Sequence, residues 1–287
     1  MRIDLHTHSA ISDGTDTPDE LVQAAARAGL DVVALTDHDT FDGLDDAEAT
    51  GRRLGVRVVR GLELSCVRSG SSVHLLGYGA DPESPRLAGE LARVRQGRQS
   101  RLAGVLEKLA GLGVPVTEEA VMRRVGESPS VGRPHIADAL VEAGHVRDRT
   151  EAFDRYLYDG GPAHVERYAI PLELGVDLVH DAGGVAVVAH PWGRGRERLL
   201  PPDVLETLVR EHGLDGVEVD HQDHDRDARR RLRRLVQRLD VLGTGSSDYH
   251  GTGKTDHDLG CNTTDPDVLA EIDRRLAARA AAAPTAP

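Results

Sequence analysis

Aromatic residues and cysteines are both scarce in this chain. Phe, Trp and Tyr make up 3% of the 287 residues, so Val, Leu and Ala must fill the core. The only cysteines, Cys66 and Cys261, are too few for a disulfide framework, which indicates a reduced compartment. No apolar run approaches the ~20 residues that span a bilayer, and the first residues indicate a strand and not a secretory signal. We therefore expect a cytoplasmic protein without membrane contact.

The chain also lacks a surplus of basic residues. It has 48 acidic and 35 basic side chains, for a net charge of −13. Proteins that bind long double-stranded nucleic acid non-specifically usually show a basic face, so we expect no such partner. A small anionic substrate is still compatible with this charge, because divalent cations would reverse the sign of an acidic pocket.

What the chain does have is an alternation of strand and helix patterns, interrupted once. Strand patterns at 3–5, 32–36, 56–64 and 73–78 alternate with helical ones, and the alternation resumes after about 170. The stretch 96–165 shows helical patterns alone. Seven βα-like units predict an α/β fold with a barrel of fewer strands than the usual eight. We expect a barrel built from 1–95 and 166–287, a helical insertion at 96–165 that caps the substrate, and a disordered tail at 280–287.

Histidine and aspartate recur together where the predicted strands end. Four segments show this pattern: Asp-Leu-His-Thr-His-Ser at 4–9 with Asp13 behind it, Thr-Asp-His-Asp at 36–39, Ala-His-Pro at 189–191 and Ser-Asp-Tyr-His at 247–250. His6 and His8 are two residues apart at a strand end, so both side chains point to one face. Neutral imidazole and ionised carboxylate are the usual protein ligands of divalent transition metals. Ends of distant strands meet at one rim of a parallel barrel, which predicts a multi-metal hydrolase.

These motifs, in this order, resemble those of the PHP (polymerase and histidinol phosphatase) family. The resemblance also includes Gly-Leu-Glu-Leu-Ser at 61–65, Val-His-Leu-Leu-Gly-Tyr at 73–78 and Gly-Ser-Ser-Asp-Tyr-His-Gly at 245–251, and it covers about 1–80 and 170–260. It implies a distorted (β/α)7 barrel that holds three divalent metal ions, with manganese favoured and iron or zinc as alternatives. It also divides nine ligands among the three metals: His6, His8 and Asp248; Asp13, His38 and His250; and His74 and His190, with Glu63 bridging the third metal to the first.

Such a cluster would supply its own nucleophile. Metals about 3.5–4 Å apart share a bridging water, lower its pKa and clamp a phosphoryl group for in-line attack. The catalytic acids would then be Asp13, Glu63 and Asp248, as the ligands that hold the attacking hydroxide. Three serines next to ligands, Ser9, Ser65 and Ser247, are interpreted as hydrogen-bond partners and not as attacking groups.

The insertion contains a candidate phosphate-binding turn, Gly-Arg-Pro-His at 132–135. Backbone N–H groups at a helix start, a guanidinium and an imidazole together suit a phosphate. We therefore predict Arg133 and His135 as substrate residues, with a solvated cap turn as the alternative. Arg194 could hold a second phosphate or simply lie on the surface. A similar segment occurs in PHP proteins that act on nucleotides, namely 3′,5′-bisphosphate phosphatases and 5′→3′ trimmers of short RNA.

The leading hypothesis is a metal-dependent phosphoesterase, a monomer or small homo-oligomer. It would remove a nucleotide phosphomonoester, such as the 3′-phosphate of adenosine 3′,5′-bisphosphate, or trim short 5′-phosphorylated RNA. Histidinol-phosphate phosphatase is an alternative with the same metal chemistry, and a non-catalytic metal-binding PHP module is an alternative of another class. Four polar residues near the motifs have no assigned role: His221, His224, Lys254 and His257.

Overall fold

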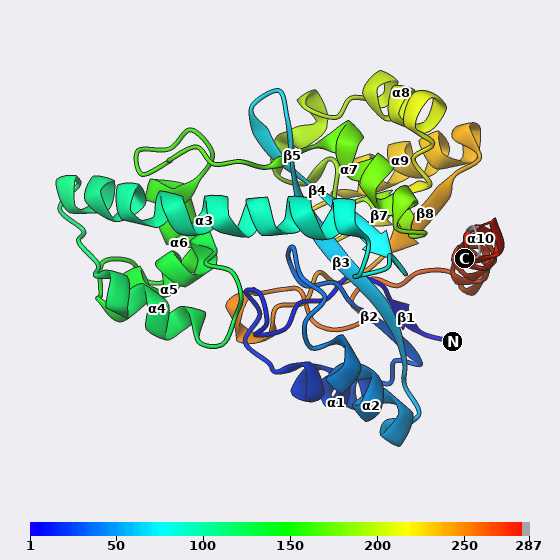
Figure 1. Cartoon of the computed structure of the whole chain (residues 1–287), viewed down its shortest axis with the longest axis horizontal. Coiled ribbons are helices and arrows are strands. Elements are labelled where there is room, and N and C mark those ends of the chain that lie inside the picture. The colour runs from blue at the N-terminus through cyan, green and yellow to red at the C-terminus, as the bar shows by residue number, and fades with distance from the viewer. Residues whose placement is uncertain (283–287) are drawn as a thin grey trace.

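A computed structural model describes residues 1–282, apart from the side chain of Arg194. Within these residues one eight-stranded sheet has the order β1-β2-β3-β4-β6-β7-β8, and β5 pairs with β3 beside this path. Figure 1 shows the sheet wrapped by helices, with a helical lobe to one side. The strands are β1 (Ile3–Asp4), β2 (Val32–Leu35), β3 (Arg57–Arg68), β4 (Ser71–Tyr78), β5 (Ile170–Pro171), β6 (Val185–Val188), β7 (Gly216–Asp220) and β8 (Leu242–Gly245).

Helices connect most of the strands. Helix α1 begins with the predicted capping box, in which the Thr17 and Glu20 side chains each accept a hydrogen bond from the other's backbone N–H. No helix within residues 1–282 is both long and apolar enough to cross a membrane. The α-helices are α1 (Pro18–Arg27), α2 (Leu44–Leu54), α3 (Pro85–Gly111), α4 (Glu118–Val125), α5 (Arg133–Glu142), α6 (Arg149–Ala152), α7 (Leu172–Asp181), α8 (Pro202–His212), α9 (Arg226–Leu239) and α10 (Pro266–Ala282), and short helical turns are η1 (Phe153–Leu157), η2 (Gly193–Arg198) and η3 (Gly251–Gly253).

The sheet curls into a nearly closed barrel. Parallel pairs join β1 to β2, β2 to β3, β6 to β7 and β7 to β8. Beyond β8 the chain returns to β1 through a bridge between Thr7 and Tyr249, where His8 N–H donates to the Tyr249 carbonyl at 2.8 Å. Apolar side chains of six strands form one core cluster, which Leu269 and Ile272 of α10 also join. The predicted α/β class and distorted (β/α)7 barrel are thus confirmed.

Strand β4 departs from the parallel order expected for such a barrel. It runs antiparallel to both β3 and β6. Ser69 and Gly70 join β3 to β4 as a two-residue turn, and both adopt positive φ, 48° and 75°. This is the turn geometry that suits a tight hairpin, which leaves no room for a crossover helix. The hairpin sets Glu63 and His74 on one face of the sheet, because Glu63 pairs with Leu76 and His74 is two residues from Leu76.

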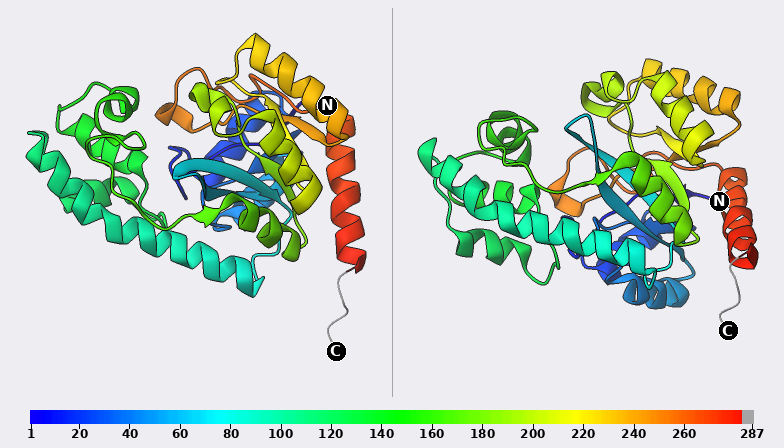
Figure 2. Two further views of the ribbon diagram at one scale, coloured as in Figure 1. Left: turned by 90° about the horizontal axis from the view of Figure 1, so that it is seen from above. Right: turned by 45° about the horizontal axis from the view of Figure 1, so that its top comes forward.

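Helix α3 belongs to two hydrophobic clusters. Its first half contributes Leu87, Leu91 and Val94 to a cluster with α7, α8 and α9. From Leu102 onward its apolar side chains pack with α4, α5 and η1 in a cluster that extends to Ala163. Figures 1 and 2 show this second half and α4–α6 as a lobe beside the barrel, at the opposite end of the molecule from α10. The predicted start of the insertion, residue 96, falls inside α3.

The last helix corrects one expectation. Residues 280–282, which we expected to be disordered, complete the final turn of α10. The remaining residues of the expected tail, 283–287, lie outside the described residues.

Candidate metal centre

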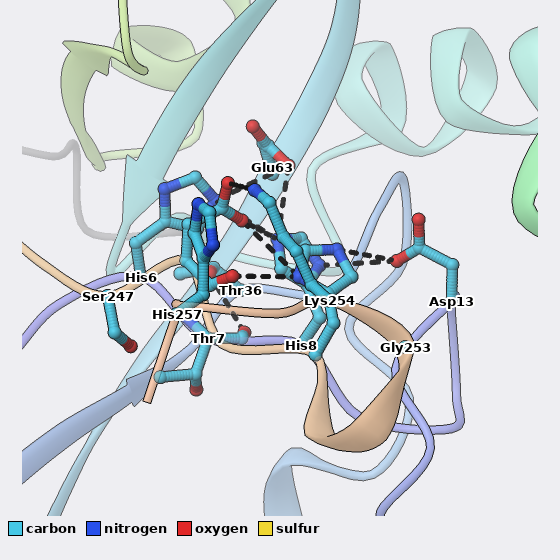
Figure 3. Close-up of polar contacts among 12 residues, drawn as sticks. His6, Thr7, His8, Asp13, Thr36, Glu63, Ser247, Gly253, Lys254 and His257 are labelled. Atoms are coloured by element: carbon cyan, nitrogen blue, oxygen red, sulfur yellow. Dashed lines mark hydrogen bonds and ion pairs between the residues drawn. The ribbon is translucent and has the colours of Figure 1, made fainter. Parts of the chain in front are cut away.

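The nine predicted ligands meet at one end of the barrel. Asp13 lies in the loop before α1, Glu63 and His74 lie in β3 and β4, and the other ligands follow the ends of β1, β2, β6 and β8. In the close-up of Figure 3, His8 lies between Glu63 and Asp13. All are buried except His74, whose side chain is 21% exposed. The gathered residues are His6, His8, Asp13, His38, Glu63, His74, His190, Asp248 and His250.

Glu63 is the centre of this cluster. Its two carboxylate oxygens face five imidazole rings from four different strand ends. Oε2 lies 3.4, 3.2 and 3.1 Å from nitrogens of His6, His8 and His38, and Oε1 lies 2.9 and 3.2 Å from nitrogens of His74 and His190. A carboxylate shared in this way can bridge two cations, one on each oxygen.

Asp13 and Asp248 complete the cluster on either side of His8. Asp13 oxygens lie 3.6 Å from His38 Nε2 and 3.3 Å from His250 Nε2. Asp248 Oδ1 lies 3.6 Å from His6 Nε2 and 3.5 Å from His8 Nε2. Five groups of donors result, each of at least three atoms within 4.8 Å of one another. Four consist of predicted ligands, and the fifth combines Asp248 with His221 and His257.

Hydrogen bonds behind the rings set which imidazole nitrogen faces the cluster. His6 Nδ1 lies 3.2 Å from Glu218 Oε1, and His250 Nδ1 lies 2.9 Å from the Asp248 carbonyl. Because carboxylate and carbonyl oxygens only accept, each Nδ1 carries a proton and each Nε2 is the nitrogen that faces the cluster. This is the tautomer that a metal ligand needs.

Two buried imidazole nitrogens indicate that cations fit between the ligands. His38 Nδ1 and His74 Nδ1 are buried and make no hydrogen bond, although Glu63 oxygens lie 3.1 and 2.9 Å away. A buried polar atom without a partner is costly. A cation between each nitrogen and Glu63 would satisfy both atoms, and mixed N and O donors suit Mn²⁺, Fe²⁺ or Zn²⁺. The residues therefore fit divalent metal ions.

Burial and neighbouring charges keep His38, His190 and Glu63 in the form that metals require, whereas nearby carboxylates outweigh burial and raise the pKa of His6 and of His8. Burial lowers the pKa of His38 and of His190 to about 3, so both rings are neutral near pH 7. Burial alone would raise the pKa of Glu63, but His74, His38 and His6 outweigh it and hold that pKa well below its usual range. Glu63 is therefore ionised.

The loops that carry the ligands are held by residues next to them. Asp37 accepts hydrogen bonds from Ser9 N–H at 2.8 Å and Ser9 Oγ at 2.5 Å, and Asp39 accepts from Ser65 N–H at 2.7 Å. His190 and Asp248 have φ of 26° and 54°, which residues other than glycine rarely adopt. Such conformations persist where the surroundings fix them, typically at functional sites.

The buried carboxylate of Glu218 was not predicted from the sequence as a functional residue. Glu218 is fully buried in β7 and accepts hydrogen bonds from His6 Nδ1, from the His190 N–H at 2.7 Å and from Ser246 Oγ. Its neighbours Val217 and Val219 are also buried. A charged residue inside an otherwise apolar buried strand was the available signal.

The four residues without an assigned role differ in their surroundings. His221 Nδ1 accepts from Asp223 N–H, so its Nε2 donates to Asp248 Oδ2, 3.1 Å away. Lys254 Nζ also contacts that oxygen. His224 uses both ring nitrogens within the scaffold, on the Val219 carbonyl and the Trp192 N–H. His257 donates from Nδ1 to the Thr255 carbonyl, and its buried Nε2 has no hydrogen bond.

Two of the three predicted substrate residues, Arg133 and His135, lie in the lobe. Arg133 opens α5 and donates to Asp159 Oδ1 at 2.6 Å and to the Leu157 carbonyl at 2.8 Å. His135 is 4% exposed, and its Nδ1 accepts from Gly132 N–H at the start of α5. The side chain of Arg194 lies outside the described part of the structure. A hollow of about 460 Å³ runs between the lobe and the barrel and is lined by Ile11, Gly14, Val125 and His135, among others.

Comparison with known proteins places this geometry in context. Residues 4–110 match the model of the PHP domain family. The chain is 34% identical to a 3′,5′-nucleoside bisphosphate phosphatase of Chromobacterium violaceum, over 96% of this chain and 97% of that protein. It is 32% identical to a 5′-3′ exoribonuclease of Haemophilus influenzae, over 87% and 90%. A proposed metal-dependent phosphoesterase of Bifidobacterium adolescentis has a similar crystal structure, with a TM-score of 0.90, 37% identity and coverage of 95% and 96%.

Proposed function

The chain belongs to the PHP family and is a metal-dependent phosphoester hydrolase, and on that premise we propose that its substrates are 5′-phosphorylated nucleotides with a phosphoester on the 3′ oxygen. It would remove the 3′-phosphate of a nucleoside 3′,5′-bisphosphate, such as adenosine 3′,5′-bisphosphate, or release nucleotides from the 5′ end of short RNA. The relatives named above act on a nucleoside bisphosphate and on RNA. The single observation that carries the proposal is that all nine predicted ligands, Glu63 among them, belong to one cluster of metal-binding side chains.

We propose three divalent metal ions held by the nine donors, with manganese favoured over iron or zinc. Glu63 would be shared between cations, since each of its oxygens faces a separate set of imidazoles. When bound, such cations neutralise phosphate charge and make a coordinated water more acidic. Asp13, Glu63 and Asp248 supply the negative charge that makes a multi-cation cluster stable.

The chain's own residues prepare the site in other ways. Ser9 Oγ donates to Asp37, and Ser65 Oγ accepts from Arg98, so these two hydroxyls take part in holding the ligand loops. We assign the role of nucleophile to water. Lys254 lies against Asp248 at the border of the cluster. We assign its ammonium group to an oxygen of the phosphate that is hydrolysed.

We propose that residues 96–165 act as a cap over the substrate. Their helices border the hollow that reaches Gly14, the neighbour of Asp13. The nucleoside would lie in this hollow, with its 3′ side toward the metal centre. A cytoplasmic location and a monomeric or small homo-oligomeric state are part of the same proposal.

The proposal is tested by phosphate release from a panel of substrates. Purified protein with Mn²⁺ should hydrolyse adenosine 3′,5′-bisphosphate and short 5′-phosphorylated RNA faster than histidinol phosphate. His6→Ala and Asp248→Ala should abolish turnover while leaving the fold intact by circular dichroism. A preference for histidinol phosphate would reassign the substrate, and bound metal without any turnover would indicate a non-catalytic module. Activity that survives chelation and both substitutions would contradict the proposed function.

A further inference from the structure

One arginine of the lobe reaches two loops that lie beside the metal centre. Arg149 begins α6, and its Nη1 donates to the backbone carbonyl of Asp13 at 2.9 Å and to that of Gly253 at 3.5 Å. Asp13 is a predicted metal ligand. Gly253 precedes Lys254 on the loop that follows His250 (Figure 3). A single guanidinium group therefore joins the helical lobe to both loops.

A carboxylate of the lobe fixes the other edge of this guanidinium group. Arg149 Nε and Nη2 lie 2.6 and 2.7 Å from the two oxygens of Asp138 on α5. A two-point pair of this kind fixes the plane of the guanidinium as well as its position. The side chains of Arg149 and Asp138 are 16% and 26% exposed, so solvent screens the pair less than it screens a pair on the surface. We call Arg149, Asp138 and the two carbonyls the Arg149 clamp.

Gly253 provides the space that the guanidinium group occupies. A Cβ atom at residue 253 would overlap Nη1 and Cζ of Arg149. Gly253 does not have the positive φ that would by itself favour glycine. The close approach of the Arg149 side chain is therefore the physical reason for a glycine at this position.

The two loops are also bonded to each other. Thr15 N–H donates to the His250 carbonyl at 3.2 Å, and Thr252 N–H donates to Thr15 Oγ1 at 2.9 Å. His250 Nε2 lies 3.3 Å from an oxygen of Asp13. Because Asp13 and His250 belong to one group of metal donors, a shift of either loop would change the spacing within that group.

The helix that holds the clamp also borders the substrate hollow. His135 and Asp138 lie three residues apart on α5, and therefore on the same side of that helix. His135 lines the hollow between the lobe and the barrel, whereas Asp138 holds Arg149. The position of α5 therefore affects the hollow and the two loops together.

We propose that Arg149 is a positioning residue for the hydrolysis: through the Arg149 clamp, the lobe holds the loops of Asp13 and Gly253 in the arrangement that completes the metal centre. This inference rests on the proposed function. Arg149 acts through backbone carbonyls and not through a contact with the substrate. The lobe thus supports the ligand set in addition to covering the substrate.

Metal affinity is the first readout, because it does not require turnover. Arg149→Met removes the donors and keeps much of the length of the side chain. Chelator-treated protein is titrated with Mn²⁺ in competition with a fluorescent chelator. We expect one ion, that of Asp13 and His250, to bind about 10-fold more weakly, since support for a ligand is lost and the ligand itself is not. Arg147→Gln is the matched control, because Arg147 lies in the same segment with a side chain 84% exposed and pairs with Glu151.

The separate effects on kcat and KM are the second readout. With adenosine 3′,5′-bisphosphate and saturating Mn²⁺, Arg149→Met should lower kcat by about 10- to 100-fold and change KM little, because the geometry of the metal centre is altered and no substrate contact is lost. Arg149→Lys keeps the charge but loses the planar fork, so its kcat should fall between those of wild type and Arg149→Met. The lysine variant serves as the test if the methionine variant does not fold.

Gly253→Ala tests the clamp from the side of the barrel. The added methyl group should displace the guanidinium group and cause the same losses as Arg149→Met. In the double variant the losses should not multiply, because both substitutions break the same contact. Gly111→Ala on α3 is the control, since no residue of another described element lies within 4 Å of the added Cβ.

The outcomes separate the two proposals. Unchanged metal affinity and unchanged kcat in both Arg149→Met and Gly253→Ala would overturn the positioning role. Losses that multiply in the double variant, or a higher KM at wild-type kcat, would overturn it too. Wild-type protein that hydrolyses neither the bisphosphate nor short RNA would overturn the proposed function, whereas Mn²⁺ binding that depends on Arg149 would still support the positioning role.

Discussion

Glu218 Oε1 accepts a hydrogen bond from His6 Nδ1 at 3.2 Å, on the side of the ring that faces away from the cluster. On the other side, His6 Nε2 lies 3.4 Å from Glu63 Oε2. The imidazole is therefore held between two buried carboxylates. Glu218 fixes its tautomer and orientation, and Glu63 shares the space in which a cation would bind.

Substituting Glu218 should weaken metal binding without removing a ligand. Glu218→Gln keeps the size of the side chain but removes the charge that holds His6, and changes of this kind typically cost about 10- to 100-fold in metal affinity. Competition with a fluorescent chelator measures that affinity. Glu271→Gln is the control, because Glu271 pairs with Arg274 and Arg275 of its own helix, and it should bind metal as the wild type does. Equal affinities in the two variants would show that Glu218 has no such role.

Lys254 should affect the substrate and not the metal. We expect Lys254→Gln to lower kcat/KM for the bisphosphate by about 10- to 100-fold, because a charged contact to a phosphate oxygen is lost. Metal content, measured by mass spectrometry, should stay at the wild-type level. Lys108→Gln is the matched control, since Lys108 lies in the lobe and donates to the His164 carbonyl. A fall in metal content that parallels the loss of activity would instead make Lys254 a support for Asp248.

Asp215 should be important for stability and not for chemistry. It is 3% exposed, and its carboxylate accepts hydrogen bonds from His180, Arg275 and Arg279, which ties α7 and α10 to the barrel. Asp215→Asn leaves Arg279 without its charge partner and leaves Arg275 with Glu271 alone, so we expect a loss of about 3 kcal/mol in the free energy of unfolding. Asp273→Asn removes an exposed ion pair between α10 and Arg57 and should cost less than about 1 kcal/mol. Similar values from urea unfolding of both variants would refute this ranking.

The lowered pKa of Asp215 also predicts how the stability of the protein depends on pH. Burial opposes ionisation of Asp215, but His180 and Arg279 outweigh it and hold its pKa well below the ordinary 3.8. A carboxyl whose pKa is lower in the folded state contributes stability that is complete above about pH 4 and is lost as the pH falls further. Wild-type protein should therefore lose more unfolding free energy between pH 5 and pH 3 than Asp215→Asn does. Parallel pH profiles for the two proteins would contradict this.

The metal centre was largely predictable because its residues lie where strands end. His6, His38, His190 and Asp248 each follow the end of a strand, and parallel strands bring such positions to one rim. Glu218 lies within a strand, where alternation gives no indication of what its side chain meets.

The antiparallel direction of β4 and the start of the insertion were not predicted correctly from the sequence. The Ser-Gly turn at residues 69 and 70 was a readable hairpin signal, but the surrounding βα alternation favoured a parallel strand. The predicted boundary at residue 96 fell inside α3 because a continuous helix hides the point where its apolar face changes partners. The spacing of apolar residues predicts that one face of a helix is buried, but it does not predict which hydrophobic cluster that face packs against.

The central claim is that divalent cations held around Glu63 drive phosphoester hydrolysis. The most direct measurement is a titration of chelator-treated protein with Mn²⁺ that follows bound metal per chain and phosphate release from adenosine 3′,5′-bisphosphate together. We predict that turnover is absent at the start, that it rises as three ions bind, and that Glu63→Gln loses both the binding and the turnover. Full turnover by the metal-depleted protein, or by Glu63→Gln, would contradict the account.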